Sequence, residues 1–105
     1  MDEDFNEFLH VPARLAIVAL LAPASWTEFG FVRDAIDTSD SALSKQVSAL
    51  TSKGYVEVRK YKTLGGRRAL MRLTPVGREE FRRHAAALER IAAAAHAPQA
   101  AGQSD

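Results

Sequence analysis

The sequence contains no cysteine, which excludes disulfide bonds and thiolate metal sites and fits a reducing compartment. It also lacks a long hydrophobic run, because the longest one, residues 15–22, is too short to span a bilayer. The first ten residues, MDEDFNEFLH, are acidic and do not have the basic start of a signal peptide. We therefore expect a cytoplasmic protein with no membrane partner.

The sequence also lacks the patterns that carry catalysis or hold a cofactor. It contains no nucleophile–base motif, no set of catalytic carboxylates and no phosphate loop, since no helix follows Gly65-Gly66. Glu80 and His84 have the spacing of a metal-binding pair on a helix, but no third ligand is near in sequence. We interpret them as a solvated pair. We therefore expect neither an enzyme nor a protein that needs a metal or cofactor.

The 105 residues have the composition of one ordinary globular domain, with 47% hydrophobic and 26% charged residues. The net charge of +1 hides a strong asymmetry. Residues 1–44 carry eight acidic and two basic residues, whereas residues 45–90 carry twelve basic and four acidic ones. A basic half suits an anionic partner. The same asymmetry is explained equally well if the arginines are only solvent-exposed surface residues of a helix and a hairpin.

Apolar spacing predicts three short helices in the first half of the chain, at residues 12–22, 28–36 and 40–53. We expect Thr27 to cap the second helix and Ser39 to cap the third, while Trp26 lies in a very short strand. The segment DFNEFL predicts a further short helix before residue 12. Either the core of this chain or a partner subunit would cover that segment.

The second half predicts a hairpin and a long helix. Gly54 ends the third helix, and strands follow over residues 55–61 and 69–74, with Gly65-Gly66 as the turn. Alternation places Val56 and Val58 on one face of the first strand and Tyr55, Glu57, Arg59 and Tyr61 on the other. Thr74-Pro75 then opens a helix that runs to about His96. Residues 97–105 have the low complexity of a disordered tail.

This order of elements predicts an α+β, mainly α fold. Three short helices, a β-hairpin wing and a long C-terminal helix together suggest a winged helix-turn-helix. We expect a DNA-binding domain over residues 1–96, in which the last helix, about residues 75–96, serves for dimerisation.

The helix over residues 40–53 has a narrow apolar side and an outer side of small residues. Leu43, Val47 and Leu50 cluster on a helical wheel and should face the core. Small side chains elsewhere would let the helix enter a major groove about 12 Å wide. Serine is a weaker helix former than alanine by roughly half a kcal/mol per residue. Four serines on one face therefore lower helix stability without any gain in packing, so we favour a binding face over a surface that is serine-rich by chance. The predicted DNA-binding residues here are Ser39, Ser41, Ala42, Ser44, Lys45, Gln46 and Ser48.

Two long polar side chains stand in the first two turns of this helix. Lys45 can reach O6 and N7 of guanine, and Gln46 can bind adenine through two hydrogen bonds. Ala42 can meet a thymine methyl group. The sequence thus offers candidate base readers without naming the operator.

The hairpin tip concentrates positive charge around two glycines. Such cations are well placed for phosphates or for a narrow minor groove, although charge on an edge strand also prevents aggregation. Their position just after the third helix favours DNA contact. The predicted DNA-binding residues of this wing are Lys60, Lys62, Arg67 and Arg68.

The long C-terminal helix carries an apolar, alanine-rich stripe. Three short helices cannot cover so long a helix, so we expect its C-terminal half to contact a second copy of the chain. The alternative is that it docks onto the first helix of its own chain. The predicted dimer-interface residues are Phe81, Ala85, Leu88, Ile91, Ala92 and Ala95.

Four ordered stretches resemble the winged helix-turn-helix transcriptional regulators of the MarR/ArsR-like kind, especially the small single-domain group. These stretches are LHVPARLAIVALLA, FGFVRDAID, SALSKQVSALTSKGYVEV and GGRRALMRLTPVGREEF, and they cover about residues 8–90. The resemblance implies buried positions at Leu43, Val47 and Leu50. It also implies groove-facing residues at Ser41, Ala42, Ser44, Lys45 and Gln46, and wing contacts from Arg67 and Arg68.

The resemblance further implies a homodimer that binds a near-palindromic operator through paired terminal helices. Two positions depart from the family pattern: Thr51 stands where an acidic residue is common, and Gln46 where a basic residue or histidine is common. These departures affect the base preference and not the fold. Larger relatives bind phenolic ligands or metals, but this chain lacks cysteines and a metal cluster. No small-molecule effector is therefore inferred.

Together these features predict a homodimeric, sequence-specific regulator of double-stranded DNA that represses by covering a promoter. It would be cytoplasmic and associate with the nucleoid when bound. The alternative is a winged helix that binds another protein and not DNA.

Overall fold

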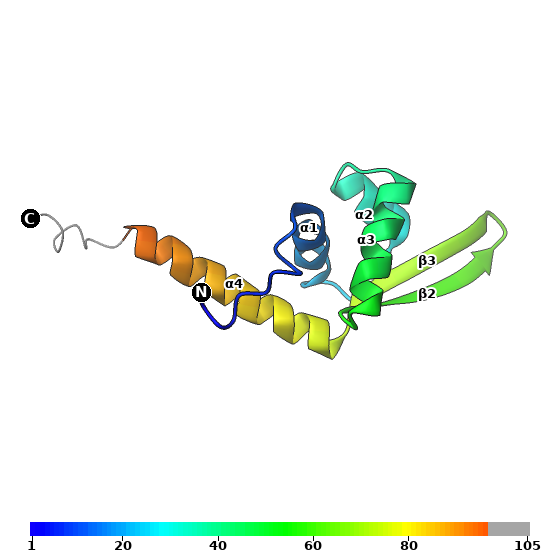
Figure 1. Cartoon of the computed structure of the whole chain (residues 1–105). Coiled ribbons are helices and arrows are strands. Elements are labelled where there is room, and N and C mark those ends of the chain that lie inside the picture. The colour runs from blue at the N-terminus through cyan, green and yellow to red at the C-terminus, as the bar shows by residue number, and fades with distance from the viewer. Residues whose placement is uncertain (97–105) are drawn as a thin grey trace, which may run out of the picture.

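The computed structural model describes residues 1–96 as four helices and one three-stranded sheet (Figure 1). The predicted disordered tail, residues 97–105, lies outside the described residues. The predicted order of three short helices, a hairpin and a long helix is confirmed. The elements are α1 (Pro12–Leu21), β1 (Thr27–Glu28), α2 (Phe29–Ala35), α3 (Asp40–Ser52), β2 (Val56–Thr63), β3 (Gly66–Leu73) and α4 (Pro75–His96).

Helices α1, α2 and α3 gather around one core, from which the hairpin and α4 extend in opposite directions (Figure 1). The N-terminal segment runs beside α4 before it enters α1. None of the helices described in residues 1–96 is long and apolar enough to cross a membrane. The buried residues of this core are Leu9, Ile17, Val18, Leu21, Val32, Leu43, Val47, Leu50, Tyr55, Val56, Met71 and Leu73.

Local sequence signals fix both ends of α3. The backbone N–H of Ala42 donates to the Ser39 side-chain oxygen at 3.1 Å, which confirms Ser39 as the N-cap. Gly54 has a φ of 84°, a left-handed conformation that glycine adopts without a Cβ clash. In this conformation the N–H of Gly54 donates to Thr51 and that of Tyr55 to Leu50. The helix therefore ends at the predicted place and the chain turns directly into β2.

The start of α2 differs from the prediction. Its N-cap is Glu28, which makes no side-chain cap hydrogen bond. Thr27 instead belongs to β1, pairs with Met71, and donates its hydroxyl to the carbonyl of Ser25. Trp26 lies just before this strand. Because Thr27 pairs with β3, it lies in a strand and does not cap α2.

The sheet has the order β1-β3-β2, and all neighbours are antiparallel. Thr63 pairs with Gly66, so the two-residue turn is Leu64-Gly65, one residue earlier than predicted. Gly66 has a φ of 116° and begins β3. Strand alternation predicts that Tyr55 shares a face with Glu57 and Arg59, but Tyr55 precedes β2 and is only 7% exposed. The left-handed turn at Gly54 sets the direction of the Tyr55 side chain, so strand alternation does not apply to this residue.

The first turn of α4 packs tightly against the end of the α3–β2 connection. A Cβ on Gly77 would overlap the backbone of Tyr55, so glycine is required for this approach. The Thr74 hydroxyl accepts the N–H of Gly77 at 2.9 Å and donates to the carbonyl of Gly54 at 2.6 Å. The predicted Thr74-Pro75 helix start is thereby confirmed, and it fixes α4 relative to α3.

The short helix predicted from DFNEFL is absent, and turns replace it. The Asp2 carboxylate accepts the N–H of Asp4, and the Asn6 side-chain oxygen accepts the N–H of Leu9. These side chains take N–H groups that a helix would pair with backbone carbonyls. Leu9 is fully buried, so the core of this chain covers the segment.

Candidate nucleic-acid interface

Helix α3 presents its predicted polar residues outward. Leu43, Val47 and Leu50 are buried, with at most 6% exposure, as the helical wheel predicts. The predicted DNA-binding residues of α3 are exposed, apart from Gln46, which is half-buried. The exposed ones are Ser39, Ser41, Ala42, Ser44, Lys45 and Ser48.

The serines of this face are not equivalent. The Ser39 oxygen caps the helix and also lies 3.4 Å from the Ser41 hydroxyl. Within residues 1–96, neither Ser44 nor Ser48 makes a side-chain hydrogen bond to the protein. Their hydroxyls are thus available to a base edge or a phosphate, while Ser39 contributes mainly to the helix start.

The two basic residues of the acidic half of the chain both contact α3. Arg14 on α1 donates from Nε to the Gln46 side-chain oxygen at 2.9 Å. Arg33 on α2 lies 2.8 Å from Asp40 and 2.9 Å from Asp34. Sequence reasoning missed both contacts. The available signal was the scarcity of bases in residues 1–44, where each of the two has a specific partner.

The hairpin carries its predicted cations on both faces. Lys62 pairs with Arg67 across the ladder, and Lys60, two residues away, lies on the same face. Arg68 lies on the opposite face, where it pairs with Tyr61. All four predicted wing cations are exposed. None of them lies within ion-pair distance of an acidic residue in the described part of the chain.

An open groove of about 1060 Å³ separates the wing from α2 and the start of α3. All four wing cations are among the residues that line it, together with Phe31 of α2 and Asp40 of α3. The structure thus brings the wing residues together around one hollow. Lys45 and Gln46 instead line a smaller pocket of about 250 Å³ between α1 and α3.

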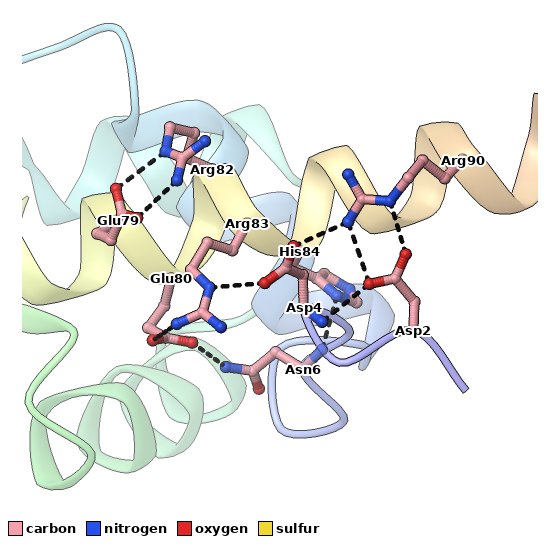
Figure 2. Close-up of polar contacts among 9 residues, drawn as sticks. All are labelled: Asp2, Asp4, Asn6, Glu79, Glu80, Arg82, Arg83, His84 and Arg90. Carbon is pink, nitrogen blue, oxygen red and sulfur yellow. Dashed lines mark hydrogen bonds and ion pairs between the residues drawn. The ribbon is translucent and has the colours of Figure 1, made fainter.

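The arginines of α4 have a different environment, shown in Figure 2. Arg90 contacts Asp2 at 2.7 Å and Asp4 at 2.9 Å, and Arg83 contacts Asp4 at 2.9 Å. Hydrogen bonds from Arg90 and from the N–H of Asp4 lower the pKa of Asp2 to about 2. The Arg83 guanidinium similarly lowers the pKa of Asp4. These α4 arginines therefore anchor the acidic N-terminal segment.

His84 is buried and does not form the solvated pair predicted with Glu80. Its Nδ1 accepts the N–H of Asn6 at 3.0 Å, and its Nε2 lies 3.3 Å from Nδ1 of His10. Glu80 accepts from the Asn6 side-chain amide instead. The N-terminal segment, distant in sequence, covers His84 and excludes solvent. Residues 1–96 contain no group of three potential metal ligands.

The predicted interface stripe of α4 is divided between two environments. Phe81 packs against the core of this chain, and Ala85 and Leu88 are half-buried. The later residues Ile91, Ala92 and Ala95 are exposed, Ile91 to 43%. The residues of α4 that are fully covered by this chain are Gly77, His84 and Ala87.

Comparison with known protein families assigns most of the chain to one DNA-binding domain. The family model of the winged helix DNA-binding domain matches residues 13–92. No curated protein sequence matches the chain.

Several solved structures share the fold. A transcriptional regulator homologue from Pyrococcus horikoshii OT3 is 24% identical, with a TM-score of 0.78 over 85% of this chain and 88% of that one. The PcaV transcriptional regulator from Streptomyces coelicolor, solved with its natural ligand, is 26% identical, with a TM-score of 0.70 over 95% and 70%. A second PcaV structure gives 25% identity and a TM-score of 0.73 over 98% and 74%.

Proposed function

This chain belongs to the winged helix DNA-binding domain family of transcriptional regulators, and we propose that it represses transcription as a homodimer on a near-palindromic operator. In this proposal α3 enters the major groove and the β2–β3 wing contacts the backbone or the minor groove. The carrying observation is the set of five exposed cations, Lys45, Lys60, Lys62, Arg67 and Arg68, which have no acidic partner in residues 1–96.

Charge without an internal partner favours an external anion. Lysine and arginine bound to DNA phosphates release counterions, which contributes strongly to affinity. The small residues of α3 add a surface that fits a groove. Phosphate contacts by the wing would position α3, while Lys45 and its neighbours would select bases.

The exposed end of α4 supports dimerisation. Ile91, Ala92 and Ala95 present an apolar surface that the rest of residues 1–96 leaves uncovered. Pairing of two such helices would place two copies of α3 about one helical turn of DNA apart, roughly 34–36 Å. The operator would then share the two-fold symmetry of the protein.

Gel-shift assays at low salt with fragments of the protein's own upstream region test the DNA proposal. We expect a retarded band that weakens steeply as salt rises. A variant with glutamine at Lys60, Lys62, Arg67 and Arg68 is the matched control and should bind far more weakly. If the wild-type protein shifts no fragment, the rival function, binding of a protein partner, replaces this one.

Light scattering tests the dimer separately. We expect a mass of two chains, and a mass of one chain for a variant with Ile91→Glu and Ala95→Glu. A monomeric wild-type protein would remove the dimer from the proposal without affecting DNA binding by a single copy.

A further inference from the structure

Arg14 fixes the orientation of the Gln46 side-chain amide. Its Nε donates to the Gln46 oxygen at 2.9 Å, and one terminal nitrogen donates to the carbonyl of Phe8 at 3.1 Å. Its guanidinium also lies 4.2 Å from the centre of the Phe8 ring. A guanidinium contains only donors, so the atom that faces it must be the amide oxygen. The amide nitrogen therefore points away from Arg14.

The Gln46 amide nitrogen is left with no protein partner in residues 1–96. Over the same residues, no buried side-chain nitrogen or oxygen lacks a hydrogen-bond partner. Nε2 must therefore be accessible from solvent. On the side away from the buried Leu43 and Leu50, its neighbours one turn away on α3 are Ala42 and Ala49, whose small side chains leave room for an incoming group. Gln46 thus presents two N–H donors to solvent, while its carbonyl oxygen is turned toward Arg14.

We propose that Arg14 determines base specificity by making Gln46 a donor-only reader of guanine. A free glutamine binds adenine with its oxygen accepting from N6 and its nitrogen donating to N7. The Arg14 contact holds the oxygen toward α1 and so turns the acceptor half of that pairing away from the DNA. Guanine presents two acceptors, O6 and N7, which match the two remaining donors. A hydrogen bond from a cation to the amide oxygen also polarises the amide and strengthens its N–H donors.

This inference rests on the proposed function and changes the expectation that Gln46 reads adenine. The other role available to the contact is structural, because it joins α1 to α3. A purely structural contact would change stability and overall affinity equally on all sequences. A change of preferred base at one operator position separates the two roles.

Binding-site selection followed by competition with single-base operator variants provides the test. For the wild-type protein we expect guanine at one position in each half-site to depend on Gln46. Arg14→Met should release the amide oxygen and shift that position toward adenine by roughly tenfold relative to guanine. Preferences at all other positions should stay unchanged.

Gln46→Glu is the second variant, because its carboxylate still accepts from Arg14 but offers neither donor. It should shift the same position toward cytosine, whose N4 amino group donates to a carboxylate. This variant keeps the test available if Arg14→Met fails to fold.

Unchanged base profiles in the variants that bind would overturn the inference and leave the proposed function standing. So would a uniform loss of affinity on every fragment, which would mean that Gln46 contacts a phosphate or serves only in packing. Failure of the wild-type protein to bind any fragment would overturn the proposed function and this inference together.

Discussion

The arginines of α4 and the arginines of the wing differ in what lies beside them. Arg83 and Arg90 contact carboxylates of the N-terminal segment, as Figure 2 shows. Arg67 and Arg68 are exposed at the hairpin tip and have no ion-pair partner among residues 1–96. The same residue type thus holds the fold together in one region and stays free for an external anion in the other.

This difference changes the meaning of the charge asymmetry in the sequence. The basic half contains both sets of arginines, but the acidic residues Asp2 and Asp4 fold back onto α4 and offset part of its charge. Among residues 1–96, most of the cations without an ion pair lie on α3 and the hairpin. A count along the sequence therefore indicates an anionic partner, whereas the ion pairs locate the surface for it.

The largest expected effect comes from removing the two wing arginines. Replacing Arg67 and Arg68 by alanine should lower DNA affinity roughly tenfold at physiological salt, because two DNA phosphates per chain are then no longer neutralised. The slope of log affinity against log salt should become shallower by about 0.9 for each of these phosphates. Fluorescence anisotropy across a salt series measures both quantities.

The matched control replaces Arg83 and Arg90 by alanine, which removes the same charge. This variant should melt at a lower temperature and retain the wild-type salt slope. An equally shallow salt slope in both double variants would show that ion pairing does not separate the two regions.

Much of the fold could be predicted because its signals are local. Ser39, Gly54 and Thr74-Pro75 mark element ends within a few residues of themselves, and Leu43, Val47 and Leu50 follow helical spacing. The exposed residues of α3 and the wing were predicted from the same local patterns.

The contacts that join distant segments could not be predicted in this way. Arg14 meets Gln46 across 32 residues, and Asn6 meets His84 across 78. The spacing of apolar residues within one helix or strand does not indicate which distant residues will come into contact. For the same reason the solvated Glu80–His84 pair was wrong, since the segment that buries His84 lies at the other end of the chain.

The next effect is a pH dependence confined to the paired region. The Nδ1 of His84 accepts an N–H, so its proton lies on Nε2 and faces His10. Burial lowers the pKa of His84 below the ordinary 6.5, and the electrostatic effect of the neighbouring His10 ring lowers it further. The unfolded chain therefore binds this proton more readily than the folded one. The contribution of neutral His84 to the free energy of unfolding should be fully present above about pH 6.5. It should decrease as the pH falls from there through the lowered pKa.

Urea unfolding from pH 8 to pH 5 measures this decrease. His84→Gln should give a flatter profile, while His96→Gln, at an exposed histidine, should follow the wild-type protein. The Asp2 pair contributes outside this window: because its pKa is lowered from 3.8 to about 2, its contribution disappears only as the pH falls through that lower range. A wild-type decrease that persists in His84→Gln would assign the effect to another group.

The smallest effect concerns the unpaired α3 face, where stability and binding should change in opposite directions. Ser48→Ala should raise the free energy of unfolding by roughly 0.5 kcal/mol, because alanine is the better helix former. It should weaken DNA binding by about fivefold or less, because one hydroxyl hydrogen bond to the DNA is removed. Ser39→Ala is the contrasting variant: it should lower the free energy of unfolding by roughly 1 kcal/mol, because the Ser39 oxygen caps α3. If Ser48→Ala stabilises the protein without weakening DNA binding, the serine face serves neither packing nor recognition, and the wing alone distinguishes this surface from α4.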